Sequence, residues 1–253
     1  MPPLLSIIIV TFDSERWIKK CITSLEQQDY HTFEVIMVDN DSHDNILEAI
    51  KGYRSIKLIK NNKNIGFSAA CNMGILQASG EYLLFLNPDV VVKKDTIKVV
   101  LSYLGRNKDV GIVSCRLCNE EGTLQYSCRR FPGLMTQLVK RFFPNSKIVI
   151  DYLMVNSDHF KIMDVDWLLG AFLFVRRKVF DDVGLFDENF FLYFEDVDFC
   201  YRAKKNGWRV VYYPLSVATH MHVRASRRFL SKEAFHHLRS MFHYYNKHGW
   251  RLF

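Results

Sequence analysis

The sequence predicts an α/β protein with a doubly wound, mostly parallel central sheet, flanking helices and a C-terminal amphipathic helix. Two observations favour this fold. Apolar, β-branched runs alternate with helical stretches through the first half of the chain, as in parallel sheets whose strands are joined by helices. Acidic residues follow two of these runs, at the edge where open α/β sheets bind ligands. With 253 residues, 49% of them hydrophobic, the chain is long enough to form a full core.

The elements of the first half follow from local patterns. The run at 4–10 suits a strand buried on both faces, and Ser14 is expected to cap the helix after it. In chain order we expect strand 4–10, helix 15–28, strand 33–38, helix 44–51, strand 56–59, helix 68–78, strand 82–86, helix 93–104, strand 110–115 and a hairpin turn at 119–123.

The second half is less regular. Residues 129–163 are the least patterned, and we expect a variable, substrate-facing insertion or mobile loop there, with no chemistry assigned. Beyond it we expect strand 167–175, helices 177–183 and 195–205, strands 208–213 and 216–221, and helix 232–247. We divide the chain into a catalytic domain at 1–226, with a nucleotide-binding half at about 1–114 and an acceptor half at about 115–226, and a basic amphipathic segment at 227–253.

Charge is concentrated at the C-terminal end. Residues 224–253 contain seven basic side chains and one acid, Glu233, so they hold +6 of the formal net charge of +7. The nearly neutral body argues against a nucleic-acid binder, whereas a local basic patch is expected of a peripheral membrane contact. The helix at 232–247 also places apolar side chains along one side, at Phe235, Leu238, Phe242 and Tyr245. A membrane-surface helix and a helix packed on the core both fit this pattern.

The amino terminus and the cysteines indicate a cytosolic compartment. The terminus lacks a basic region, and the apolar run that follows stops at Val10, too short for a signal peptide or a membrane span. The six cysteines are expected to be free thiols. Cys115 and Cys118 form a C-x-x-C with Cys128 nearby, but no fourth ligand completes a zinc site.

Two nucleotide-binding motifs are absent from the sequence. Thr11 and the residues after it stand where a dinucleotide-binding fold needs G-x-G-x-x-G, which disfavours an NAD-dependent oxidoreductase. No G-x-x-x-x-G-K-[ST] occurs either, which excludes the P-loop enzymes.

Acidic and glycine-containing turns follow the predicted strands. Asp39 can accept hydrogen bonds from a base or a ribose, although an Asx-turn would use it equally well. Asp89, in Asn87-Pro88-Asp89, can meet a metal ion and the phosphates that the ion carries. Gly66 opens a helix and would let an anion approach its N-terminus, although a glycine turn with amide caps explains it too.

Six motifs, in this order and spacing, resemble glycosyltransferase family 2, and most closely its bacterial rhamnosyltransferase-like members. The motifs are Ser6-Ile7-Ile8-Ile9-Val10-Thr11-Phe12, Val38-Asp39-Asn40-Asp41-Ser42, Asn64-Ile65-Gly66-Phe67, Asn87-Pro88-Asp89, Asp166-Trp167-Leu168-Leu169-Gly170-Ala171 and Glu195-Asp196-Val197-Asp198. The resemblance runs from about Ser6 to Ser226. It implies a GT-A fold, a nucleotide-sugar donor, a divalent cation (Mg²⁺ or Mn²⁺) and an inverting transfer.

The resemblance also assigns roles to residues on the donor side. Thr11 and Asp39 would hold the nucleoside, and Asn64 and Gly66 would lie against the nucleotide sugar. Asn87 and Asp89 stand where the family places its D-x-D signature. Because Asn87 replaces the first acid, the site has one fewer negative charge and binds its cation weakly until the diphosphate arrives.

The metal and the reaction centre involve a second group of residues. Asp89 and His220 would hold the metal, and Asp196 matches the usual catalytic base, with Glu195 in support. The residues expected to form a loop beside the sugar are Trp167, Gly170 and Ala171. Without the resemblance, the acids at 195–198 are equally explained as dipole-stabilising residues of a helix N-terminus.

We therefore expect an enzyme that transfers a sugar, L-rhamnose from dTDP-L-rhamnose, onto a growing, polyprenyl-linked cell-surface polysaccharide such as an O-antigen, in the bacterial cytoplasm or at the inner face of the plasma membrane. Two alternatives stay open. One is a UDP-hexose or UDP-galactofuranose transferase, because nothing local in the sequence reads the sugar hydroxyls. The other is a non-catalytic glycan- or nucleotide-binding scaffold of a polysaccharide assembly complex.

Overall fold

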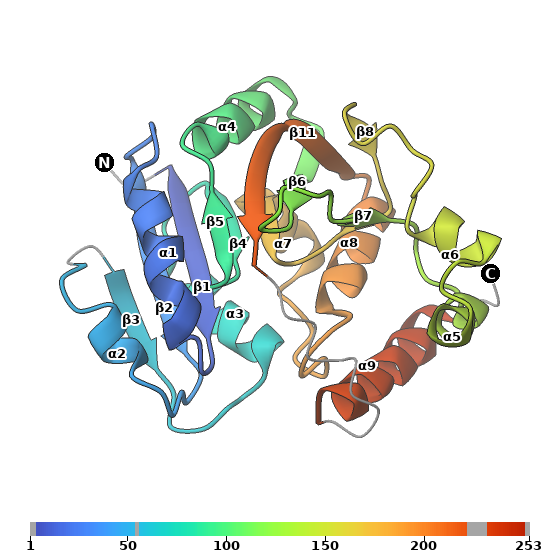
Figure 1. Ribbon diagram of the computed structural model, residues 1–253, viewed down its shortest axis with the longest axis horizontal. Helices are drawn as coiled ribbons and strands as arrows, with labels where there is room; N and C mark the ends of the chain where they lie inside the picture. The colour runs from blue at the N-terminus through green and yellow to red at the C-terminus, as the bar shows by residue number, and fades with distance from the viewer. Residues whose placement is uncertain (1–3, 54–55, 222–231, 251–253) are drawn as a thin grey trace.

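The structure, a computed structural model, describes residues 4–53, 56–221 and 232–250. Within these residues a nine-stranded sheet has the strand order β3-β2-β1-β4-β10-β6-β11-β5, with β8 paired to β11 (Figure 1). Its strands are β1 (Leu5–Thr11), β2 (Phe33–Asp39), β3 (Ile56–Lys60), β4 (Tyr82–Leu86), β5 (Val90–Val92), β6 (Val110–Cys118), β8 (Met163–Asp164), β10 (Phe172–Arg176) and β11 (Arg209–His220). A separate two-stranded sheet joins β7 (Cys128–Arg129) to β9 (Trp167–Leu168).

The sheet is mostly parallel, as predicted. Strands β3, β2, β1 and β4 pair in parallel, and β6 pairs in parallel with β11. Strand β10 lies between β4 and β6 and runs antiparallel to both, so β6 and β11 point the same way as β1 to β4. The carboxyl ends of the parallel strands therefore meet at one edge, where ligands bind in open α/β sheets.

Helices cover both faces of the sheet. They are α1 (Glu15–Glu26), α2 (Ile46–Ala49), α3 (Phe67–Gln77), α4 (Thr96–Arg106), α5 (Leu134–Phe142), α6 (Lys147–Tyr152), α7 (Arg177–Val183), α8 (Glu195–Lys205) and α9 (Lys232–His248). Side chains alternate along a strand, so Ile7 and Ile9 of β1 pack with α1, α2 and α4, whereas Ile8 and Val10 pack with α3, α7, α8 and α9. The result is a three-layer core.

Several predicted boundaries differ from the structure. The expected strand at 167–175 is broken near Gly170 into β9 and β10, which belong to different sheets. The two strands expected at 208–221 are one strand, β11, with a register shift between Tyr213 and Val217 that accommodates Pro214. Residues 129–163 contain α5 and α6. The hydroxyl of Ser14 bonds Phe12 and does not cap α1.

Helix α9 is tied to the core by a buried charge network. Asp198, at the start of α8, has a side chain with no exposed surface and lies 2.8 Å from Arg202, 2.9 Å from Lys247 and 2.7 Å from His248. Lys247 also lies 2.6 Å from Asp187. Burial alone would raise the pKa of Asp198, but these partners outweigh burial and lower it. The C-terminal end of α9 is thereby fixed beside the N-terminal turn of α8.

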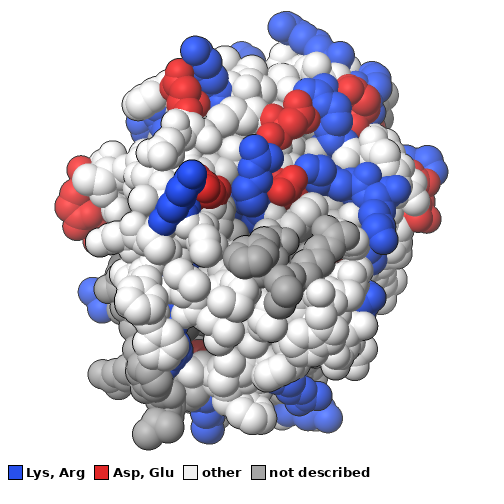
Figure 2. Space-filling view, turned by 90° about the vertical axis from the view of Figure 1, so that its right-hand side faces the viewer, with Lys and Arg blue, Asp and Glu red and all other residues white. Residues whose placement is uncertain are grey.

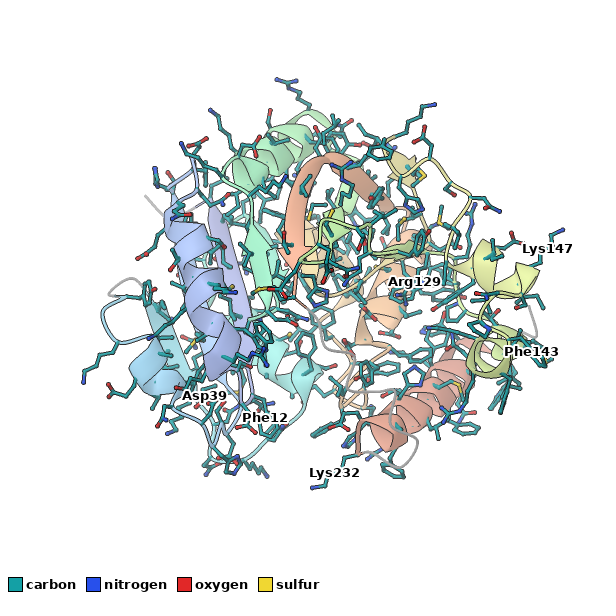
Figure 3. The ribbon with its side chains drawn as sticks, in the orientation of Figure 1. Phe12, Asp39, Arg129, Phe143, Lys147 and Lys232 are labelled. Atoms are coloured by element: carbon teal, nitrogen blue, oxygen red, sulfur yellow. The ribbon has the colours of Figure 1, made fainter. Side chains whose placement is uncertain are left out.

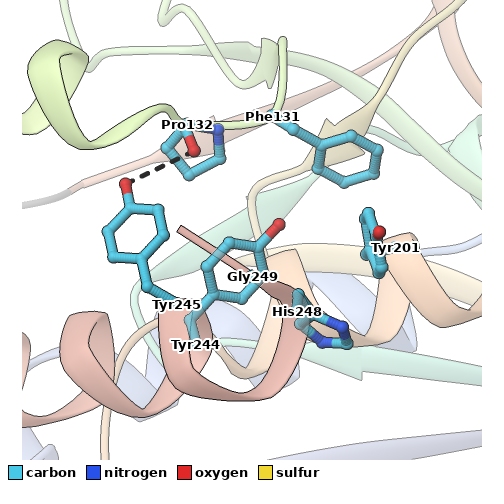
Figure 4. A pocket seen from close by; sticks show the side chains of 7 residues that line it. All are labelled: Phe131, Pro132, Tyr201, Tyr244, Tyr245, His248 and Gly249. Carbon is cyan, nitrogen blue, oxygen red and sulfur yellow. Dashed lines mark hydrogen bonds between the residues drawn. The ribbon is translucent and has the colours of Figure 1, made fainter. Parts of the chain in front are cut away.

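The apolar stripe predicted for α9 is divided between two sides of the helix. Tyr245 is fully buried, and its hydroxyl donates to the carbonyl of Pro132 at 3.3 Å (Figure 4). A cavity of about 50 Å³ lies beside it, lined by Phe131, Pro132, Tyr201, Tyr244, Tyr245, His248 and Gly249. Phe235, Leu238 and Phe242 instead face outward, each at least half exposed. The helix packs on the core and still presents an apolar outer face.

Two general features concern the residues that the structure describes. Among them, no helix combines the length and the apolar character needed to cross a membrane. All six cysteines are free thiols, and five of them are buried. The predicted boundary at 226–227 and Ser226 itself lie outside the described residues.

Candidate active site

The ends of β1 and β2 place Thr11 and Asp39 side by side at the carboxyl edge. The two are paired in register, and the amide of Asn40 donates to the carbonyl of Thr11 at 2.8 Å. One carboxylate oxygen of Asp39 accepts from the amide of Ser42 at 3.1 Å, which is the Asx-turn considered above. Its other oxygen, Oδ2, is buried and accepts no hydrogen bond. That oxygen is an acceptor available to a ligand donor at this edge. Figure 3 labels Asp39 and Phe12 at the lower left of the molecule.

The turn that follows β4 brings Asp89 against His220. Strand β5 pairs with the end of β11, so that Val90 lies opposite His220, and the amide of Met221 donates to the carbonyl of Asp89 at 2.8 Å. Oδ1 of Asp89 is 3.4 Å from Nε2 of His220. The same Oδ1 is buried and accepts no hydrogen bond. Two residues far apart in the sequence thus form one small polar site.

Gln125 orients the His220 ring. Its Oε1 lies 2.8 Å from Nδ1 of His220, and an amide oxygen only accepts, so we place the imidazole proton on Nδ1. The lone pair of Nε2 then faces the Asp89 side. An Nδ1–H bonded to a carbonyl-type oxygen is the usual support of a metal-binding histidine.

Asp89 and His220 fit a divalent cation. A buried carboxylate oxygen and an imidazole nitrogen that face each other need a cation or a proton between them, and both groups are common metal ligands. Among residues 4–53, 56–221 and 232–250, no cluster of three or more His, Cys, Asp or Glu side chains is arranged for a metal. The site therefore fits an ion that arrives with further oxygen ligands, such as a diphosphate.

Glu195 and Asp196 occupy the first turn of α8. The chain reaches them through Tyr193 and Phe194, both with a φ of 68°, a left-handed conformation that costs non-glycine residues about 1–2 kcal/mol each. Both carboxyl groups are buried. The sharp turn sets two acids next to each other at a positively polarised helix end.

Asp196 is the member of this acidic pair whose charged form the protein stabilises better. Burial, followed by the charge of Asp196, raises the pKa of Glu195 well above its usual range, and Glu195 Oε2 is buried without a hydrogen-bond partner. Burial also raises the pKa of Asp196, but the amides of Gly170 and Val197 and the charge of Arg129 oppose it. The pKa of Glu195 is therefore raised more than that of Asp196, because Asp196 has amide donors and a nearby cation that oppose burial.

The segment between β9 and β10 links the two groups of residues. The amide of Gly170 donates to Oδ2 of Asp196 at 3.0 Å. The next residue, Ala171, accepts at its carbonyl from the amide of Asn87, also at 3.0 Å. One dipeptide thus bonds to the catalytic-base candidate on one side and to the turn that carries Asp89 on the other, so the predicted motifs converge on one place.

Trp167 has a packing role in this structure. It is buried, and its indole N–H donates to the carbonyl of Arg130 at 2.8 Å. The guanidinium of Arg129 lies over its ring, 4.9 Å from the centroid. Arg129 therefore covers one face of the Trp167 ring, and its charge acts on Asp196.

Asn64 and Gly66 make contacts within the protein. Oδ1 of Asn64 accepts from the side chain of Asn40 and from the amide of Gly66. Gly66 has a φ of 90°, and a Cβ there would come within 2.8 Å of Phe191. The amide of Phe67 donates to the carbonyl of Phe191 at 2.7 Å. This segment therefore ties the N-terminal half to the loop before α8.

Sequence reasoning missed Gln125 and Arg129. Both lie in the stretch after the predicted hairpin turn, in Leu124-Gln125-Tyr126-Ser127-Cys128-Arg129, where no strand or helix periodicity marks a site. An isolated polar residue carries no signal of its own. Only the arrangement of β7 beside β9 and of Gln125 beside β11 reveals their contacts.

Comparison with known proteins agrees with the geometry. The family model described as glycosyl transferase family 2 matches residues 6–170, and a second, glycosyl transferase family group 2, matches residues 111–233. The rhamnosyltransferase WbbL of Escherichia coli is 31% identical over 94% of this chain and 91% of its own length. An N-acetylglucosaminyl-diphospho-decaprenol L-rhamnosyltransferase of Mycobacterium tuberculosis is 28% identical over 99% of this chain and 87% of its own.

A solved structure supports the fold. The mannosyltransferase PcManGT of Pyrobaculum calidifontis, determined with GDP-Man and Mn²⁺, aligns with a TM-score of 0.64 at 19% identity, over 89% of this chain and 59% of its own. The likeness concerns the fold alone, since this chain spans less than two thirds of that protein. The architecture is that of the GT-A glycosyltransferases. Taken together, the ordered motifs, the sheet and these matches place this chain in glycosyltransferase family 2, and it is a glycosyltransferase.

Proposed function

We propose that this protein is an inverting rhamnosyltransferase, which moves L-rhamnose from dTDP-L-rhamnose to a growing glycan on a polyprenyl-linked carrier at the inner face of the plasma membrane. The observation that carries the proposal is the convergence of Asp89, His220 and Asp196 around the dipeptide 170–171. The choice of donor and acceptor is supported by similarity, along nearly the whole chain, to two rhamnosyltransferases, one of them named for a decaprenyl diphosphate-linked acceptor.

Asp196 acts as the general base. Inversion requires in-line attack by an acceptor hydroxyl on the anomeric carbon, with a carboxylate within hydrogen-bond reach of that hydroxyl. The proton passes to Asp196 as the new C–O bond forms, and the bond to the diphosphate breaks with its electron pair on the leaving oxygen. The amides of Gly170 and Val197 hold the carboxylate in place at 3.0 and 2.8 Å. Glu195, protonated beside it, keeps a second charge from building up.

Asp89 and His220 would hold a divalent cation. A bound Mg²⁺ or Mn²⁺ neutralises charge on the departing diphosphate. Asn87 stands two residues before Asp89, at the position of the missing acid, so two strong ligands come from the part of the chain that the structure describes, and the donor would supply others. Metal and donor are then expected to bind together, each raising the affinity for the other.

The nucleoside lies at the ends of β1 and β2. Thr11 and the unpartnered Oδ2 of Asp39 supply acceptors for the base or ribose. Asn64 and Gly66 shape the adjoining edge through their contacts with Asn40 and Phe191. Trp167 contributes on the sugar side indirectly, because its ring packs beneath the guanidinium of Arg129.

A panel of nucleotide sugars tests the donor. Release of nucleoside diphosphate is measured for dTDP-rhamnose, UDP-glucose and UDP-galactofuranose, with Mg²⁺, with Mn²⁺ and with chelator. We expect metal-dependent turnover that favours dTDP-rhamnose. A preference for a UDP sugar would instead identify the transferred sugar as a hexose or galactofuranose. Binding without turnover of any donor would support the scaffold alternative. The Asp196→Asn variant, which removes the base, is the matched control.

A further inference from the structure

Helices α5 and α9 share an outward apolar surface that the core does not use. Its members are Leu138, Phe142, Phe143, Phe235, Leu238 and Phe242, which are 48–67% exposed; we call it the α5/α9 face. On α9 the three residues are three and four apart, so they form one stripe along the helix. Exposed apolar side chains are common singly, but a contiguous group of aromatics marks a surface that contacts another molecule.

In Figure 1, α5 is drawn beside the C-terminal end of α9. The chain just before α5 is bonded to α9 through Tyr245 and Pro132. Lys140 and Arg141 of α5 lie close enough to His237 of α9 for their charges to act on its half-buried imidazole. The face is therefore built from two neighbouring segments, 134–143 and 235–242, and only the second of these was singled out by sequence.

Basic residues surround the α5/α9 face. Figure 2 looks onto this side of the molecule and shows a mostly uncharged lower area, with Lys and Arg below it and to its right and with both basic and acidic side chains above it. Lys140, Arg141, Lys147, Lys232 and Arg239 belong to α5, α6 and α9. Helix α5 contains no acid and α9 contains only Glu233. Lys147 and Phe143 project from the same outer end of the molecule (Figure 3). Apolar side chains with cationic margins match the acyl boundary and the headgroups of an anionic bilayer.

The opposite side of α9 packs on the loop that leads to Asp196. The ring of His236 stacks on Phe191 with centroids 4.3 Å apart, and Ser240 donates to the carbonyl of Leu192 at 2.9 Å. The α5/α9 face and the loop before the acidic pair therefore lie on opposite sides of one helix, whose diameter with side chains is about 10–12 Å. An acceptor diphosphate at the headgroup level would lie near the base.

We propose that the α5/α9 face docks on an anionic lipid bilayer and so presents the active site to a lipid-linked acceptor. The proposal rests on the proposed function, since it concerns the same acceptor. A second copy of this chain is a poorer occupant, because a two-fold dimer would bring the same basic margin onto itself. An anionic bilayer neutralises that charge and covers the aromatics in one step.

Vesicle co-sedimentation tests the docking face. The full chain is mixed with vesicles of phosphatidylcholine alone or with added phosphatidylglycerol. Wild type should sediment with the anionic vesicles, and less so in high salt. The triple variant Phe142→Ser, Phe143→Ser, Phe235→Ser should lose about tenfold or more of its partition coefficient. The charge variant Lys147→Glu, Arg239→Glu should lose the preference for anionic vesicles.

A matched triple variant controls for the loss of apolar surface. Leu76, Phe160 and Leu215 are 72%, 74% and 64% exposed and lie on other parts of the surface, so their replacement by serine should leave vesicle binding unchanged. Equal binding by wild type and the α5/α9 triple variant would overturn the proposal. So would a wild-type dimer, seen by sedimentation velocity, that this variant dissociates without any vesicle binding.

Donor turnover without lipid separates this proposal from the proposed function. Wild type and the α5/α9 triple variant should release nucleoside diphosphate at the same rate in the absence of vesicles. Vesicle binding without turnover of any donor would count against the proposed function alone. Turnover of dTDP-rhamnose without vesicle binding would count against the docking face alone.

Discussion

Replacement of Asp196 by asparagine separates the charge of the base from its position. The carboxylate accepts two backbone hydrogen bonds, from Gly170 at 3.0 Å and Val197 at 2.8 Å. Asparagine keeps one acceptor oxygen, so one of the two backbone amides loses its hydrogen-bond partner, which costs about 1–3 kcal/mol of stability. Burial of a neutral group in place of a charged one offsets part of that cost. The variant should therefore fold, and its stability should stay near that of wild type.

The rate should fall much more than the stability. A general base contributes about 10²–10⁴-fold, or about 2.7–5.5 kcal/mol in the barrier. We expect Asp196→Asn to lower kcat by that factor and to leave donor affinity within about threefold. Steady-state release of nucleoside diphosphate with acceptor gives kcat, and calorimetric titration of the donor gives affinity.

Glu195→Gln is the matched comparison, because glutamine has the shape of a protonated glutamate. If Glu195 holds the proton of the pair, this variant should retain turnover within about tenfold of wild type. Wild-type kcat/KM should rise with pH as the pair loses the first of its two protons, and the rise should stay at about the same pH in Glu195→Gln, since glutamine is neutral like the protonated glutamate that it replaces. Near-normal turnover in Asp196→Asn, with loss in Glu195→Gln, would refute the assignment.

Three further predictions concern the metal site, the α9 network and the glycine turn. Asp89→Asn should weaken Mn²⁺-dependent donor binding, and Gln125→Leu should weaken it by about 10–100-fold, because His220 loses its orienting partner; titration with and without Mn²⁺ measures both. Asp198→Ala should lower the free energy of unfolding by about 3–5 kcal/mol, because its buried cationic partners lose their acceptor; urea denaturation measures it. Since the pKa of Asp198 is lowered in the folded state, the stability it adds is present above its unfolded pKa of about 3.9 and is lost as the pH falls through and below that value. Gly66→Ala should cost at least about 2 kcal/mol, because φ is 90° and the added Cβ meets backbone.

Each of these predictions has a control within the chain. Gln125→Glu keeps an acceptor oxygen and should preserve metal-dependent binding, so an equal loss in both variants would argue against orientation. Asp109 pairs with Arg209 at the surface, and Asp109→Ala should change stability little; a loss as large as that of Asp198→Ala would show that burial is not the cause. Gly184 has a φ of 79° with nothing near its Cβ position, so Gly184→Ala should be the milder glycine substitution.

The order of strands, helices and motifs could be predicted from the sequence because each depends on local patterns. The apolar run at 4–10, and the acid that follows the run at 33–38, can each be recognised from a few neighbouring residues. The structure has β1 and β2 at these positions. Predictions that spanned a break failed, as at 167–175, where Gly170 separates two strands of different sheets. Local apolar character shows that a segment is buried, but it does not show which sheet the segment joins.

Long-range contacts could not be predicted in the same way. The contact of Asp89 with His220 joins residues 131 positions apart, and the bond of Gln125 to His220 depends on where β11 ends. Gly66 looked like a ligand turn, and the structure adds its close contact with Phe191. Pairings of this kind depend on the relative placement of whole elements.

The sequence by itself determined the fold class, the family and the identity of the acids at the sheet edge, because strand periodicity, turn chemistry and motif order are properties of neighbouring residues. The tertiary structure decided which of two adjacent carboxyls keeps its charge, since burial and the amides of Gly170 and Val197 act only after folding. The tertiary structure also decided which side of α9 faces outward. A helical stripe shows that one side is apolar, but only the packing of Tyr245 inward and Phe242 outward shows which residues the core leaves exposed.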